Sequence, residues 1–291
     1  MIRTVKFRKY YGRNRGVECL DLEVFKGEIF GFIGPNGAGK STTIRSLLGF
    51  IKPTEGELFL FDTPCTDKNL AMLKTKIGYL PSEVNYYENM KVGQLLRYAA
   101  RYYNKDCTTR INELCDYFEL DQKRLIEDLS YGNRKKVAVV QAFMHLPELL
   151  ILDEPTGGLD PLIQNKFFEL IKKEHARGAT VFFSSHILSE VQKLCHRVGI
   201  IKDGFMIQVK SLDALKGTQY KKVVLKLSGG SQFNQGDFIL RDLNIENGEV
   251  RFIYEGDVND LACLMSNLRL DDFSVQEPDL EEIFMHYYSD K

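Results

Sequence analysis

A glycine-rich segment near the N-terminus carries the residue types that bind phosphate groups. It reads Gly34-Pro35-Asn36-Gly37-Ala38-Gly39-Lys40-Ser41, follows an apolar run, and precedes a helical pattern that begins at Thr42. This matches the pattern G-x-x-x-x-G-K-[ST] in the strand–helix context that the pattern requires. The glycines allow several backbone N–H groups to converge on phosphate oxygens at a helix N-terminus. Lys40 adds a positive charge, and the Ser41 hydroxyl is placed to bind Mg²⁺.

Two adjacent carboxylates follow a second apolar run. Residues 149–152 read Leu-Leu-Ile-Leu, and Asp153 and Glu154 come directly after them. A buried parallel strand explains the apolar residues, whereas a protein core has no use for two neighbouring acids. Phosphoryl transfer uses both, because Asp153 can hold the Mg²⁺ shell while Glu154 orients and deprotonates the attacking water. Together with the glycine-rich segment, the acidic pair indicates hydrolysis of a phosphate bond.

The elements that must position these residues alternate between short apolar strands and helical patterns, which predicts an α/β fold. The expected strands cover residues 28–34, 57–61, 148–153 and 180–184, and the expected helices cover 42–50 and 161–177. Asp160 and Pro161 supply an N-cap and a first-turn proline for the second of these helices. Between about residues 85 and 145 the apolar side chains follow a helical period, which predicts an all-helical subdomain.

The pattern of expected strands and helices changes again near the C-terminus of the sequence. Strands are expected at residues 223–227, 250–254 and 273–275. Asp257 is placed to cap one helix, and Pro278-Asp279 is placed to open a last one. We therefore predict a small α+β domain over residues 218–291 and an α/β core over residues 1–217.

Composition limits the kinds of partner. The chain has 291 residues with 39 basic and 40 acidic side chains, a formal net charge of -1, which gives no global reason to expect nucleic acid or an anionic membrane. No apolar run approaches the roughly 18 residues of a spanning helix, and the first residues lack the pattern of a signal peptide. The six cysteines include no C-x-x-C pair, which favours reduced thiols over a zinc site or a disulfide framework. Membrane association is expected only through another chain.

A third segment makes the pattern specific to one family. It reads Leu129-Ser130-Tyr131-Gly132-Asn133 and precedes a helix that we expect to begin at Arg134. It resembles the L-S-G-G-Q signature of the ATPase subunits of ABC transporters, with Tyr131 and Asn133 as departures. The resemblance implies a P-loop NTPase core of the ABC ATPase type. In that family the signature loop binds the γ-phosphate of ATP in the opposite subunit, and the resemblance implies this role for Ser130 and Gly132.

Two further positions match nucleotide-binding residues of the family. His186, at the end of an expected strand, is similar to the switch histidine that contacts the γ-phosphate. The resemblance therefore implies a catalytic set of Lys40, Glu154 and His186. Tyr11 matches the aromatic residue that stacks on adenine, and the adjacent Tyr10 is the alternative for this role.

One position departs from the family at the metal site. Ser82 stands where these proteins commonly have a glutamine that touches Mg²⁺ and water and senses the permease. The serine side chain is shorter and would reach the metal through a water. The resemblance implies ATP and Mg²⁺ as cofactors, with Ser41, Asp153 and Ser82 near the metal.

The resemblance extends over about residues 2–217 and is greatest with bacterial exporters of the drug, bacteriocin or antibiotic-resistance kind. It implies an ATP-hydrolysing subunit that dimerises on ATP, with an identical or a different second ATPase subunit, and drives a separate transmembrane permease. Such a chain is cytoplasmic and peripheral on the inner face of the cell membrane. We expect the permease to contact the segment from Ser82 to Tyr103, where Tyr86, Tyr87 and Met90 offer a groove wall, with ordinary packing as the alternative.

Two other functions are alternatives to the transporter interpretation. One is a soluble ABC-type ATPase that acts on ribosomes or DNA without a permease. Such relatives usually carry two cassettes in one chain or a long coiled coil, and neither pattern is present in this sequence. The other is an ATP sensor that does not hydrolyse, which the presence of both Glu154 and His186 argues against. No nucleic-acid partner is expected.

Overall fold

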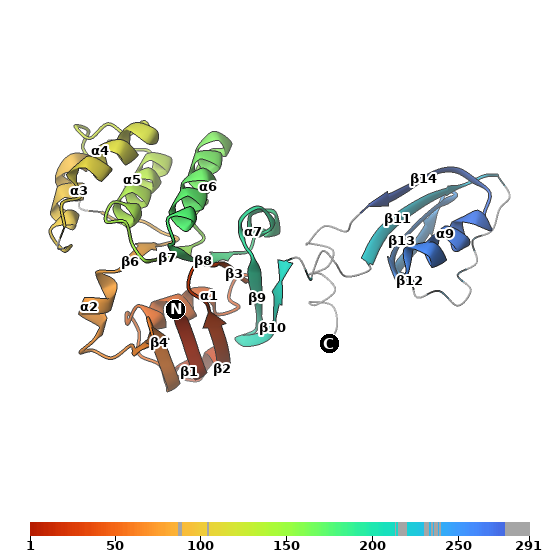
Figure 1. Cartoon of the computed structure of the whole chain (residues 1–291), viewed down its shortest axis with the longest axis horizontal. Coiled ribbons are helices and arrows are strands. Elements are labelled where there is room, and N and C mark those ends of the chain that lie inside the picture. The colour runs from red at the N-terminus through yellow and green to blue at the C-terminus, as the bar shows by residue number, and fades with distance from the viewer. Residues whose placement is uncertain are drawn as a thin grey trace. The chain divides into compact units, whose positions relative to one another are not determined.

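The computed structural model divides the chain into two compact units, Met1–Lys210 and Ser211–Lys291 (Figure 1). The structure describes residues 1–86, 89–103, 105–212, 214, 220–229, 233, 235, 238 and 240–276. The domain boundary predicted between residues 217 and 218 lies outside these residues. Each unit has its own hydrophobic core.

A six-stranded sheet forms the centre of the first unit. Its strand order is β10-β9-β3-β8-β7-β6. The strands are β3 (Ile29–Ile33), β6 (Ile77–Leu80), β7 (Leu149–Asp153), β8 (Thr180–Ser185), β9 (Arg197–Lys202) and β10 (Phe205–Ser211). Every residue of β3, β7 and β8 is buried, as expected for parallel strands covered on both faces. These three strands and β6 pair in parallel, so their carboxyl ends reach the same edge of the sheet.

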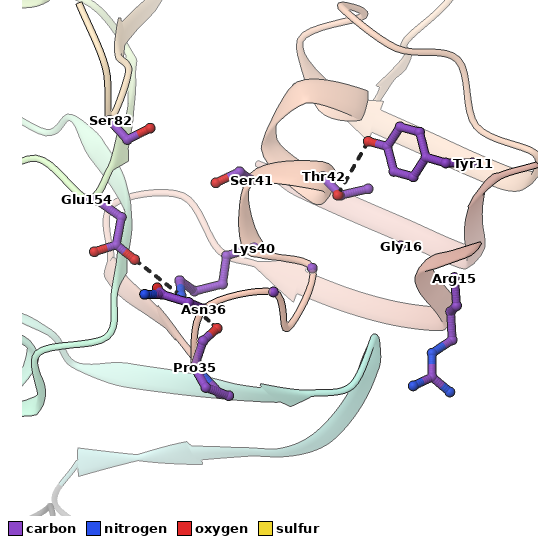
Figure 2. Close-up of a pocket in the computed structure, with 12 residues that line it drawn as sticks. Tyr11, Arg15, Gly16, Pro35, Asn36, Lys40, Ser41, Thr42, Ser82 and Glu154 are labelled. Atoms are coloured by element: carbon purple, nitrogen blue, oxygen red, sulfur yellow. Dashed lines mark hydrogen bonds and ion pairs between the residues drawn. The ribbon is translucent and has the colours of Figure 1, made fainter.

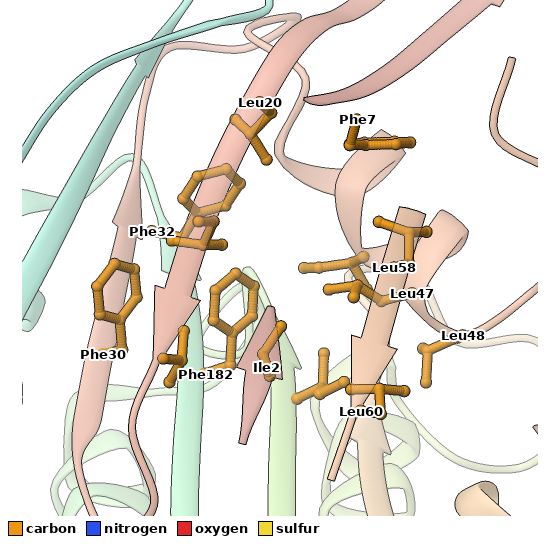
Figure 3. Close-up of a cluster of buried hydrophobic side chains, with 14 of the residues drawn as sticks. Ile2, Phe7, Leu20, Phe30, Phe32, Leu47, Leu48, Leu58, Leu60 and Phe182 are labelled. Atoms are coloured by element: carbon orange, nitrogen blue, oxygen red, sulfur yellow. The ribbon is translucent and has the colours of Figure 1, made fainter. Parts of the chain in front are cut away.

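A second, antiparallel sheet with the order β2-β1-β4-β5 completes this unit. Its strands are β1 (Ile2–Tyr11), β2 (Asn14–Val24), β4 (Glu55–Leu60) and β5 (Thr63–Pro64). Helix α1 (Lys40–Leu47) supplies Ile44 and Leu47 to a core that also takes Phe7 and Leu20 from this sheet and Phe182 from the central one (Figure 3). Burying such side chains stabilises the fold by about 1.5–3 kcal/mol each. Helix α1 is thereby packed against both sheets.

The predicted helical subdomain is present, and its helices lie together in Figure 1. It contains α3 (Val92–Ala100), α4 (Thr108–Tyr117) and α5 (Tyr131–Phe143), while α2 (Leu70–Lys74), α6 (Pro161–Ala176) and α7 (Leu188–Leu194) belong to the rest of the unit. Asp160 caps α6 as predicted, because its Oδ1 accepts hydrogen bonds from the backbone N–H groups of Leu162 and Ile163, both at 3.0 Å. Among the described residues, no helix is long and apolar enough to cross a membrane.

The second unit is an antiparallel sheet with one described helix. The strands are β11 (Tyr220–Leu227), β12 (Leu240–Glu246), β13 (Glu249–Glu255) and β14 (Leu270–Gln276), in the order β12-β13-β11-β14. Helix α9 (Val258–Ser266) begins after Asp257, whose Oδ1 accepts a hydrogen bond from the Asn259 N–H at 2.7 Å. The α+β character and the three expected strands are confirmed. The last expected helix, opened by Pro278, lies outside the described residues.

Candidate nucleotide site

Four strands of the central sheet deliver the polar residues of the site. The glycine-rich segment follows β3, Pro81 and Ser82 follow β6, Glu154 follows β7 and His186 follows β8. The register places Asp153 opposite Ser184 and Ile33 opposite Ser185. Since ligands of open α/β sheets bind beyond the carboxyl ends of the strands, this edge is where the topology places a site.

The glycine-rich segment lines a cavity of about 390 Å³ at the N-terminus of α1 (Figure 2). Gly37 and Gly39 adopt φ angles of 82° and 109°, which L side chains rarely adopt. A Cβ on Gly34 would lie 2.3 Å from the carbonyl oxygen of Ile201, so this position accepts only glycine. Ala38 is buried beneath the loop and does not line the cavity. This backbone conformation is the one that the glycine-rich segment needs if its N–H groups are to converge on an anion.

Lys40 occupies the centre of this loop. Its side chain is only 5% exposed, and its Nζ donates to the carbonyl oxygens of Gly34 at 2.6 Å and Pro35 at 3.1 Å. It also lies 3.2 Å from Glu154 Oε1. Ser41 and Thr42 line the same cavity. A buried cation held by backbone carbonyls and one carboxylate is poised to exchange that carboxylate for a phosphate oxygen.

The two carboxylates after β7 have different surroundings. Asp153 is buried and accepts a 2.7 Å hydrogen bond from Ser184 Oγ. Glu154 lines the cavity, and its φ angle of 47° places it in the left-handed region. Non-glycine residues in this conformation cluster at functional sites. The turn directs the Glu154 side chain towards Lys40, as Figure 2 shows.

His186 contacts the second oxygen of the same carboxylate. Its Nδ1 lies 2.5 Å from Glu154 Oε2, and its side chain is 48% exposed. Below it, Ser185 Oγ donates to the carboxylate of Glu190 at 2.9 Å. Burial raises the pKa of Glu190, and hydrogen bonds from Thr156 and Ser185 offset part of this shift. The structure thus brings the three predicted catalytic residues, Lys40, Glu154 and His186, into one connected group.

Tyr11 lies at the opposite rim of the cavity. Its hydroxyl is 3.5 Å from Thr42 Oγ1, and its side chain is 45% exposed. A Cβ on Gly16 would lie 3.0 Å from the Tyr11 ring, so the glycine lets the ring pack closely. Tyr10, the alternative aromatic residue, donates its hydroxyl to Glu18 instead. The cavity is also lined by Arg15, which the sequence did not single out; its guanidinium lies 4.9 Å from the Phe205 ring centroid.

Ser82 faces the cavity from the segment after β6 (Figure 2). Its carbonyl oxygen accepts a 2.9 Å hydrogen bond from Nζ of Lys135, a residue of α5 that belongs to no motif in the sequence. The Lys135 side chain is fully buried. Burial lowers the pKa of Lys135 to about 8, although the charges of Asp153 and Glu154 oppose this shift.

Helix α5 begins three residues earlier than expected, at Tyr131 instead of Arg134. The reason is Ser130, which has an extended backbone and accepts a 3.4 Å hydrogen bond from the Asn133 N–H. Gly132 and Asn133 are therefore in the first helical turn. Ser130 and Gly132 do not line the cavity. A Cβ on Gly158 would lie 2.1 Å from the Tyr131 ring, so this turn packs against the segment that follows Glu154.

A Mg²⁺ ion at this site would need phosphate oxygens or water molecules in addition to the described side chains. Within the described ranges, no group of three or more His, Cys, Asp or Glu side chains could hold a metal ion. The cavity is lined by the hydroxyls of Ser41 and Ser82 and by the carboxylate of Glu154, and the buried carboxylate of Asp153 is next to Glu154 in the chain. Mg²⁺ commonly binds through one or two carboxylates together with substrate phosphates and water, so this donor set fits it. A dedicated all-protein cage is not required.

The phosphate loop, the acidic pair and the parallel sheet define a P-loop nucleoside triphosphatase. The family model described as "ABC transporter" matches residues 17–157. Bacitracin transport ATP-binding protein BcrA of Bacillus licheniformis is 32% identical over 98% of this chain and 96% of its own length. Linearmycin resistance ATP-binding protein LnrL of Bacillus subtilis (strain 168) is 31% identical over 98% of this chain and 97% of its own length.

A solved structure, the dimeric bacterial ABC transporter cassette MJ0796, has the same fold. It superposes with a TM-score of 0.67 at 24% identity, covering 73% of this chain and 99% of that one. Sequence relatives and fold therefore agree. The chain belongs to the ABC transporter ATP-binding proteins: it is the ATP-binding subunit of an ABC transporter, an ATPase, and its relatives include resistance proteins.

Proposed function

We propose that two ATPase subunits, each with this site, close around ATP, and that Glu154 activates the water that attacks the γ-phosphate. The observation that carries this proposal is the group formed by Glu154 with Lys40 and His186 at the mouth of the phosphate loop. A carboxylate beside a phosphate-binding cation is where a general base for hydrolysis must lie. Hydrolysis then reopens the pair and drives a separate permease.

The nucleotide binds along the cavity. The backbone of Gly34 to Gly39 and the first turn of α1, with Ser41 and Thr42, surround its phosphates, and Lys40 neutralises the β- and γ-phosphates. Tyr11 stacks on adenine, since it is the half-exposed aromatic side chain at the far rim of the same cavity. Arg15 adds a positive charge at this rim.

Mg²⁺ bound near Ser41, Asp153 and Ser82 would neutralise charge on the β- and γ-phosphates. The chain's own residues do the remaining work. Glu154 accepts the proton of the attacking water, and His186 holds the second Glu154 oxygen and contacts the γ-phosphate. Lys40 must release Glu154 when phosphate arrives, which frees the carboxylate for the water.

The N-terminal turn of α5 acts on the opposite nucleotide. Ser130 and Gly132 are at a helix N-terminus, where backbone N–H groups and the helix dipole favour an anion. The adjacent Tyr131 is 53% exposed, which suits an interface. The dimeric state of cassette MJ0796 supports such a pairing. The second subunit is a copy of this chain or a similar ATPase.

The permease binds at two adjoining hollows of the helical side. One is lined by Tyr86, Tyr98 and Tyr102, the other by Phe50 and Tyr79, and both share Tyr103 and Gln141. Met90 lies nearby in sequence, and Tyr87 lies outside the described residues. An apolar helix can dock in such an aromatic groove. The chain then works as a peripheral protein on the cytoplasmic face of the membrane. The names of its relatives, with linearmycin resistance among them, favour export.

The test is the assembly state of Glu154→Gln with ATP and Mg²⁺. This variant binds ATP but lacks the base, so it should elute as a dimer on size-exclusion chromatography. Lys40→Ala in the same background should stay monomeric because ATP no longer binds. A Glu154→Gln protein that binds ATP and remains monomeric would contradict the proposed cycle.

A further inference from the structure

Lys135 is a buried cation outside the group formed by Lys40, Glu154 and His186. It lies in the second turn of α5 and is completely buried. Its Nζ donates to the carbonyl oxygens of Pro81 at 2.8 Å and Ser82 at 2.9 Å. Burying an ammonium group is unfavourable even with good partners, and well-packed apolar replacements of buried charges are often neutral or stabilising. Stability alone therefore gives no reason for a lysine here.

Lys135 joins two segments that have different roles in the proposed cycle: the segment after β6 and helix α5. Pro81 and Ser82 follow β6, and Ser82 lines the nucleotide cavity. The same segment continues to Tyr86, which lines the aromatic groove. Lys135 itself lies one turn along α5 from the exposed Tyr131, the first residue of this helix.

Charge also connects Lys135 with the hydrolytic residues. Asp153 and Glu154 are the carboxylates whose charges favour its protonated form. A protonated amine offers three donors and holds two carbonyl oxygens at once, which a methionine cannot do. The lysine therefore joins the segment after β6 to α5 by two charge-assisted hydrogen bonds.

We propose that Lys135 is a positioning residue that fastens the Pro81–Ser82 segment to helix α5. The nucleotide cavity and the N-terminal turn of α5, which holds Ser130 and Gly132 and is called the signature turn below, then move as one rigid body. ATP bound beside Ser82 thereby sets the orientation of the turn that is offered to the second subunit. This inference rests on the proposed dimer cycle. Without the fastening, a subunit still binds ATP but presents its signature turn in several orientations.

The experiment uses the full chain with Glu154→Gln, which holds ATP without turnover. Lys135→Met removes charge and donors at similar volume, and Lys135→Gln keeps an amide donor. Lys172→Met replaces an exposed lysine of α6 and is the matched control. Two quantities are measured for each protein: the ATP affinity of the monomer at high dilution, and the dissociation constant of the ATP-bound dimer by sedimentation velocity.

Lys135→Met should leave the ATP affinity within about twofold of its parent and weaken the dimer by about tenfold, the size expected for losing a hydrogen bond to a charged group. The dimer dissociation constant of Lys135→Gln should lie between those of its parent and Lys135→Met, because the glutamine amide can still donate a hydrogen bond to one carbonyl. If Lys135→Met does not fold, Lys135→Gln carries the test.

An unchanged dimer constant in a folded variant would overturn the proposal and leave Lys135 as a packing residue. An equal loss of ATP affinity would overturn it too, because Lys135 would then shape the cavity itself. Failure of the proposed function would look different: the parent and the Lys172→Met control would both fail to bind ATP or to dimerise.

Discussion

The carboxyl edge of the central sheet and the N-terminal turn of α5 hold their polar groups in different ways. At the sheet edge, Lys40 and Glu154 are 5% and 22% exposed and are joined by direct contacts that extend to His186. At the turn of α5, Tyr131 is 53% exposed, and Ser130 makes a hydrogen bond only within its own turn. One region is organised within the chain, whereas the other presents its groups outward.

The sheet edge holds the groups proposed for ATP hydrolysis, and the turn of α5 holds the groups proposed to contact the second subunit. The groups proposed to bind phosphate and activate water are already assembled in one chain. The positions that depart from the usual family residues, Ser82, Tyr131 and Asn133, lie where the cavity meets α5 and at the outward-facing turn. We therefore expect substitutions at the sheet edge to alter the reaction itself, and substitutions near α5 to alter how often two subunits close.

The largest effect is expected at the base. Glu154→Gln should lower the turnover number by about 10²–10⁴-fold, the usual contribution of a general base, with ATP binding retained. Glu148→Gln is a matched control, because Glu148 precedes the same strand and pairs with Lys76 at 3.4 Å, away from the cavity. Steady-state ATPase assays measure both variants. Equal rates for the two would remove Glu154 from the mechanism.

The next effect concerns binding. Lys40→Ala should weaken ATP binding by about 10²-fold or more, since the variant loses the cation that several charge-assisted contacts require. Lys76→Ala changes the residue just before β6, whose Nζ pairs with Glu148, and should bind ATP normally. Titration with a fluorescent ATP analogue measures the affinity, and circular dichroism checks the fold. Unchanged affinity in a folded Lys40→Ala protein would contradict the site.

The sequence predicted the sheet edge better than the turn of α5 for a physical reason. The segment from Gly34 to Ser41 depends on local backbone geometry, so its sequence pattern is enough to predict a phosphate-binding loop. The ion pair of Glu154 with Lys40 needs β3 and β7 to lie on either side of β8, and only the sheet shows that it forms. The left-handed backbone of Glu154 has no sequence signal at all.

The start of α5 shows where pattern reading was wrong. The sequence pattern places Tyr131, Gly132 and Asn133 in a loop of small residues before the helix, yet the Ser130 cap and packing against Gly158 include them in the first turn. Lys135 was overlooked because a lysine in a helical pattern is normally exposed. Strands β1 and β2 were not expected either, although they form most of the second sheet.

A smaller effect tests the buried charge of Lys135 by its pH dependence. Its pKa is lowered to about 8 in the folded protein and is near 10.5 when exposed. Below about pH 8 both states are protonated and the folded state bears the full cost of the buried charge; as pH rises, the folded state loses its proton first and becomes relatively more stable. Between about pH 7 and about pH 9, the free energy of unfolding of the wild type should rise by about 1 kcal/mol relative to that of Lys135→Met, as measured by urea unfolding. Parallel stability curves for the two proteins would show that the buried amine does not titrate in this range.

The smallest effect is expected at the altered coupling position. Ser82→Gln restores the longer side chain beside the cavity and should raise the turnover of the isolated chain by about two- to fivefold, by increasing the population of closed pairs. Glu83→Gln places the same side chain one residue later, at an exposed position, and should have no effect. The comparison uses ATPase rates at one protein concentration. A lower rate in Ser82→Gln would mean that the serine is suited to this site.

The most direct measurement is the ATPase rate per subunit as a function of protein concentration, with and without the reconstituted permease. If the catalytic groups are complete in each chain and closure between chains is limiting, the rate per subunit should rise with concentration and then level off. The permease should shift that rise to lower concentration, because it holds two subunits together. A rate per subunit that is already maximal at the lowest concentration, and indifferent to the permease, would contradict the account.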